Sequence, residues 1–165
     1  MTDTVASARS PRFHRLIWLM PAAYALHIVE EHRGGFAAWV THVVGGEMND
    51  LAFALNNAAF MAILLALVVW TAVSKSRLAT FLLIVWSSGN LFWDALFHVV
   101  LTQALDRYSP GLVTAALLYV PISLVVAQLA LGERLLTPRP FLAATALGAG
   151  LMGLVIWYGL FHFAV

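Results

Sequence analysis

The sequence contains no cysteine and few charged residues. Without cysteine there are no disulfides, thiolate-bound metals, iron–sulfur clusters or cysteine nucleophile, so a metal would have to be bound by His, Asp, Glu or Asn. Charged residues make up 10% of the 165 residues, whereas soluble domains carry about 25%. The net charge of +1 provides neither the basic surface of a nucleic-acid-binding protein nor an acidic tail. We therefore expect no nucleic-acid partner.

Hydrophobic residues account for 62% of the chain and are concentrated in long runs. Each run is long enough to cross a hydrocarbon core of about 30 Å as a helix. The runs lie near residues 16–34, 51–73, 78–105, 112–131 and 140–163. They predict an all-α integral membrane protein: a tail at 1–15 and a single transmembrane domain over 16–165, built as a five-helix bundle. We expect a multi-pass protein of a bacterial-type plasma membrane.

Basic residues in the connecting segments predict the orientation. The tail contains three arginines, and two later connections contain Lys75 with Arg77 and Arg134 with Arg139. The alternate connections are poor in lysine and arginine. By the positive-inside rule the N-terminus is cytoplasmic and the C-terminus extracytoplasmic. An apolar segment at 36–44 is too short to span, and we expect it on the outer surface or re-entering between helices.

Three acidic residues, Glu30, Glu31 and Asp94, fall inside the predicted spans. The spans contain no lysine or arginine apart from Arg33 at an outer edge. A charge at the bilayer centre costs about 2.5–3.5 kcal/mol even on the lenient insertion scale. The carboxylates therefore need protons, charged histidines or a metal ion beside them.

Helical spacing gathers these polar residues into two stripes. Glu30 and Glu31 follow His27 at i+3 and i+4, and so share a face with it. A second stripe at i, i+4 and i+8 contains Asn90, Asp94 and His98. At about 1.5 Å of rise per residue, both stripes lie in the outer half of the membrane, at heights matching Asn56 and Tyr119 of two other spans.

Imidazoles and carboxylates on facing helices build metal sites in helical bundles, and such ligands suit zinc, iron or manganese. The predicted ligands of a divalent metal are His27, Glu30, Glu31, Asp94 and His98. The candidate catalytic groups are Glu30, Glu31 and Asp94. The candidate cofactor-binding residues are Asn56, Asn90, Tyr119 and Tyr108, the last of which precedes a turn and could cap the site.

Three motifs occur in order along the chain: His27-Ile-Val-Glu30-Glu31, a second histidine at His98, and Tyr108-Ser-Pro110-Gly111. This set resembles the HXXEE family of small, uncharacterised, presumed integral membrane proteins. The resemblance implies that these residues form a site, and it names no reaction.

Three functions remain open. We favour a membrane metalloenzyme, a hydrolase or oxidoreductase, that takes a hydrophobic small-molecule substrate sideways from the membrane lipid. The second is a metal-free acid–base isomerase or cyclase of an isoprenoid- or sterol-like lipid, which would need no cofactor. The third is a non-enzymatic protein that binds ions, haem or quinone. A transport pathway through so small a bundle would require a homo-oligomer.

Overall fold

The computed structural model describes residues 12–162, and all of the regular structure in that range is helical. Most of the predicted tail, at 1–11, and the last three residues lie outside it. The N-terminal half contains α1 (Arg12–Leu16), α2 (Leu19–Gly34), α3 (Phe36–Trp39), the π-helix η1 (Val40–Val44) and α4 (Asp50–Ser74). The C-terminal half contains α5 (Arg77–Ser87), η2 (Ser88–Trp93), α6 (Asp94–Leu105), α7 (Leu112–Thr114), η3 (Ala115–Tyr119), α8 (Val120–Gly132), α9 (Pro138–Val155) and η4 (Ile156–Leu160).

Four continuous helical stretches are long and apolar enough to cross a membrane: 50–74, 77–105, 112–132 and 138–160. The chain therefore has the character of a multi-pass membrane protein. The polar end of α2 distinguishes it from these four, because Glu30, Glu31 and Arg33 fall within its 16 residues. Five crossings and the orientation of the termini stay predictions.

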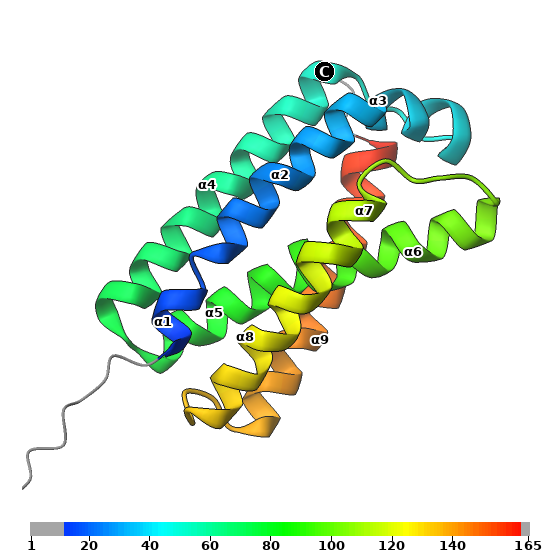
Figure 1. The fold of residues 1–165 in the computed structure, drawn as a ribbon. Helices are drawn as coiled ribbons and strands as arrows, with labels where there is room; N and C mark the ends of the chain where they lie inside the picture. The colour runs from blue at the N-terminus through cyan, green and yellow to red at the C-terminus, as the bar shows by residue number, and fades with distance from the viewer. Residues whose placement is uncertain (1–11, 163–165) are drawn as a thin grey trace, which may run out of the picture.

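Local sequence signals set the ends of the helices around the site. The Asn49 side chain caps α4 by accepting a hydrogen bond from the Ala52 amide at 2.8 Å, and Ser76 caps α5 through the Ala79 amide at 3.1 Å. Gly35 ends α2 in the left-handed conformation, with a φ of 72°. Helices α2 and α4 lie side by side (Figure 1).

Small residues bring α9 against α5 and η2. A Cβ at Gly148 would collide with the Ser88 hydroxyl, the Val85 carbonyl and the Gly89 amide. This close approach positions η2, which ends at Trp93. Helix α6 follows without a break and begins at Asp94. The main core runs along the helices, whereas a second cluster of buried side chains gathers beside α3 at one end.

The 36–44 segment forms α3 and η1 and packs onto that end of the bundle. Phe36, Trp39 and Val40 are buried against Phe53 of α4 and Leu160 of η4. In Figure 1 this segment lies at the same end as the loop between α6 and α7 and the end of η4. It therefore helps to close the part of the bundle that contains the polar residues.

Candidate metal site

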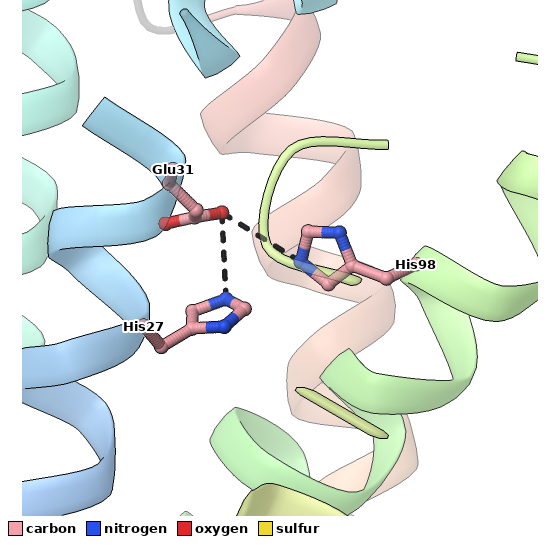
Figure 2. A group of neighbouring side chains, drawn as sticks. All are labelled: His27, Glu31 and His98. Atoms are coloured by element: carbon pink, nitrogen blue, oxygen red, sulfur yellow. Dashed lines mark ion pairs between the residues drawn. The ribbon is translucent and has the colours of Figure 1, made fainter. Parts of the chain in front are cut away.

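Four side chains converge from two helices, with one turn of helix between the members of each pair. His27 and Glu31 project from α2, and Asp94 and His98 project from α6. The His27 Nε2 atom lies 3.6 Å from Glu31 Oε1 and 3.3 Å from Asp94 Oδ2. The His98 Nε2 atom lies 3.6 Å from the same two oxygens. We call these four residues the polar cluster, and Figure 2 shows one Glu31 oxygen facing a nitrogen of each imidazole.

Three members of the polar cluster are buried and spaced like metal ligands, whereas the fourth, Asp94, is half-buried. His27, Glu31 and His98 are at most 6% exposed, and they offer ligand atoms that all lie within 4.8 Å of one another, so they could hold a metal ion. Neighbouring ligands around a tetrahedral ion with bonds of 2.0–2.2 Å are about 3.3–3.6 Å apart. The four nitrogen–oxygen separations fall in that range.

Hydroxyl groups hold the far side of each imidazole. His27 Nδ1 lies 2.9 Å from the Thr114 hydroxyl, and His98 Nδ1 lies 2.8 Å from the Ser109 hydroxyl. Neither Nε2 atom has a hydrogen-bond partner within residues 12–162. Metal-bound histidines are held in this way, through the ring nitrogen that does not face the metal.

Glu30 does not join the polar cluster, although its spacing from His27 predicts a ligand. Its carboxylate accepts hydrogen bonds from the Tyr108 and Thr114 hydroxyls. It also accepts from the backbone amides of Val113 at 3.0 Å and Thr114 at 2.7 Å. These four donors hold the Glu30 carboxylate on the start of α7, away from the Nε2 atoms.

The 108–111 segment covers the imidazole side of the polar cluster. Gly111 has a φ of 105°, and a Cβ there would lie 2.7 Å from the Cε1 atoms of both His27 and His98. A Cβ at Gly34 would lie 2.7 Å from Pro110 Cβ, so the segment also packs closely on the end of α2. Tyr108 binds Glu30 instead of reaching the cluster.

A small cavity of about 60 Å³ lies on the other side of the cluster. It reaches His27, Glu31 and Asp94, and it is also lined by Asn56 and Asn90. The remaining walls are largely aromatic and aliphatic. A space of this size, with polar groups on one wall, has room for a few water molecules.

Tyr119 lies beside the polar cluster and does not line the cavity. Its ring is fully buried against the His27 imidazole, with the centroids 4.4 Å apart. Tyr24 does line the cavity, and its hydroxyl donates to Asn57 Oδ1 at 2.8 Å. The two tyrosines thus frame the α2 side of the site.

Residues 18–126 match the family described as "Protein of unknown function with HXXEE motif". The chain belongs to the HXXEE family. Comparisons with curated proteins and with solved structures gave no match. The family resemblance carried by the three motifs is therefore confirmed. In this HXXEE protein the His-x-x-Glu-Glu histidine and second glutamate face the second histidine, and the Tyr-x-Pro-Gly segment lies over them.

Sequence reasoning missed several residues that hold the site in this HXXEE protein. Thr114 contacts the His27 imidazole, Ser109 contacts the His98 imidazole, and Gly111 lies against both. The Tyr-x-Pro-Gly pattern contains Ser109 and Gly111, so that motif was a usable signal for two of them. Thr114 carries no such signal, because a threonine in an apolar helix is common.

Proposed function

We propose that this HXXEE protein is a membrane-embedded metalloenzyme with one divalent ion bound by His27, Glu31, Asp94 and His98. The observation that carries the proposal is the ring of four nitrogen–oxygen separations of 3.3–3.6 Å between two imidazoles and two carboxylates. A buried carboxylate, Glu31, beside a half-buried one, Asp94, in an apolar bundle needs a compensating positive charge. A metal ion would supply it.

Nitrogen and oxygen ligands of this kind suit zinc, iron or manganese. A bound ion of this type supplies Lewis-acid activation of water or, in the case of iron, the reduction chemistry of oxygen. A structural zinc site is closed on all sides, whereas a catalytic one keeps a position open. The polar cluster is covered by Gly111 on one side and reaches the cavity on the other, so an ion held by its four residues could take a fifth ligand from the cavity, which favours a catalytic role.

The size and lining of the cavity limit the kind of substrate that can bind. Its volume of about 60 Å³ admits the reacting group of a molecule and excludes a whole lipid. Its walls contain Phe36, Phe53 and Phe60, and its polar groups include the Asn56 and Asn90 amides. We propose a hydrophobic substrate that places one polar group in the cavity, where the amides orient it, while the rest of the molecule stays in the lipid.

The test is elemental analysis of protein purified in mild detergent. We expect about one zinc, iron or manganese ion per chain, and loss of that ion in His27→Ala and His98→Ala. The matched control is His32→Ala, because His32 is exposed and stacks on Phe53 outside the cluster. Wild-type protein that contains no metal and gains none from added zinc, iron or manganese would refute the proposal.

One observation favours a second function. The shortest of the four separations, 3.3 Å between His27 Nε2 and Asp94 Oδ2, brings a base and an acid close to each other. The same residues would then act as an acid–base pair on an isoprenoid- or sterol-like lipid. Activity that survives chelation and is lost in Asp94→Asn would favour this function over the metalloenzyme.

A further inference from the structure

We infer that Glu30 is a positioning residue: acting through Thr114, it fixes the His27 ring with its proton on Nδ1 and a lone pair on Nε2. The inference deepens the proposed function and rests on it for the metal. It assigns different roles to the two glutamates of the motif. Glu31 faces the two histidines, whereas Glu30 sets the form of one of them.

The first step is the ionisation of Glu30. Four donors meet its two oxygens: two hydroxyls and two backbone amides. A carboxylate accepts at about four lone-pair positions and donates at none. The four donors therefore match an ionised carboxylate. In a protonated acid the O–H group would face one of these donors and displace its hydrogen bond.

The second step is the direction of the Thr114 hydroxyl. It has one proton, and its two acceptors are Glu30 Oε2 and, at 3.2 Å, the Gly111 carbonyl oxygen. Neither of these oxygens can donate a hydrogen bond. The Thr114 hydroxyl therefore donates its own proton to one of the two. Its lone pairs are then left for His27 Nδ1, at 2.9 Å.

The third step is the tautomer of His27. Because the Thr114 oxygen accepts, Nδ1 must donate and carries the ring proton. The lone pair of the neutral ring is then on Nε2, which lies 3.3–3.6 Å from the Asp94 and Glu31 oxygens. Thr114 thus holds the ring in the orientation and tautomer of a metal ligand, as hydrogen-bond partners of metal-bound histidines do.

His98 provides a contrast. Its Nδ1 contacts the Ser109 hydroxyl at 2.8 Å, and within residues 12–162 that hydroxyl has no second partner to fix its proton. The Ser109 hydroxyl can therefore rotate and either donate or accept. The two histidines differ as a result: His27 is set in advance, and His98 can adjust its tautomer when an ion binds.

The decisive variant is Thr114→Val, which preserves the shape of the side chain and removes the hydroxyl. Thr114→Ser, which restores the hydroxyl, is the matched control. Nitrogen-15 NMR of the metal-free protein reports the tautomer, and the His27 signals are assigned by their loss in His27→Gln. We expect a protonated Nδ1 in wild type and Thr114→Ser, in the neutral or the doubly protonated ring, and a shift toward an unprotonated Nδ1 in Thr114→Val.

Metal affinity gives the second readout. Competition for zinc against a chromophoric chelator should show binding that is about 10–100-fold weaker in Thr114→Val, the range typical when a metal ligand loses its hydrogen-bond partner. Glu30→Gln should weaken binding in the same direction, because an amide has one oxygen for four donors. Thr114→Ser should bind like wild type.

The outcomes separate the two proposals. A wild type that binds zinc, with Thr114→Val matching it in both tautomer and affinity, overturns the role of Glu30 and leaves the metal site standing. A wild type that binds no metal defeats the proposed function. The Nδ1 atom of His27 in that same metal-free protein still decides the inference: an unprotonated Nδ1 in wild type overturns it, and a protonated Nδ1, in the neutral or the doubly protonated ring, supports it.

Discussion

Gly111→Ala should disrupt the candidate site from the loop that covers it. The added methyl group meets two obstacles at one position. The backbone φ of 105° is a conformation that residues with a side chain rarely adopt. The methyl carbon would also stand 2.7 Å from the Cε1 atoms of both His27 and His98. Neither ring can retreat freely, because each is fixed by a hydroxyl on its Nδ1 atom.

The expected size of the effect follows from these two terms. A side chain in a disfavoured backbone region costs about 1–3 kcal/mol. Forcing one extra methyl group into a packed interior costs about 1–3 kcal/mol more. We therefore expect Gly111→Ala to lower the free energy of unfolding by about 2–6 kcal/mol. If the imidazoles move to relieve the contact, part of this loss appears as weaker metal binding instead.

The assay measures both quantities in detergent: unfolding followed by circular dichroism, and zinc affinity by competition. Gly150→Ala is the matched control, because no atom lies within 4 Å of its added Cβ and its φ is ordinary. Within α9 that substitution should stabilise the protein by about 0.5–1 kcal/mol. A Gly111→Ala protein that equals wild type in both stability and zinc affinity would refute the close packing of the 108–111 segment on the two histidines.

Three further predictions concern other parts of the molecule. Asp94→Asn should lower zinc affinity, measured by the same competition, and unchanged affinity would remove Asp94 from the ligand set. Gly148→Ala should destabilise the protein by about 1–3 kcal/mol in denaturant unfolding, whereas Gly153→Ala, with open space around its Cβ, should not; equal stabilities would contradict the close contact of α9 with η2. Burial and the hydrogen bond to Glu30 raise the pKa of Tyr108 to about 12, so this contact should stabilise the fold fully below pH 10 and be lost as the pH rises through 12. The absorbance difference between wild type and Tyr108→Phe should show that titration, and a midpoint near 10 would contradict it.

Hydropathy located the long helices because an uninterrupted apolar run is the requirement for crossing a bilayer. The run predicted at 51–73 corresponds to α4, Asp50–Ser74, and the run at 78–105 corresponds to the continuous stretch 77–105. The π-helical turns η2 and η3 could not be predicted from hydropathy. They change which carbonyl each amide bonds, without changing how apolar the segment is.

Helical periodicity brought the right stripes together and could not separate Glu30 from Glu31. At about 100° per residue, positions i+3 and i+4 lie on either side of His27 by about 60° and 40°. Both glutamates are therefore acceptable neighbours by spacing alone. The difference arises from residues more than eighty positions away, because the start of α7 brings two amides and the Thr114 hydroxyl to Glu30.

The two glutamates show two ways in which a membrane bundle accommodates negative charge. Glu30 is half-buried and has a donor for each of its lone pairs, so it is stable as an anion with hydrogen bonds alone. Glu31 is buried beside imidazole nitrogens, and the part of the chain that the structure describes gives it no comparable set of donors. Its charge is balanced only when a cation, metal or proton, occupies the space between the two histidines. The motif thus places Glu30, which is stable as an anion, next to Glu31, whose charge needs a cation beside it. This need makes the polar cluster suited to binding a cation.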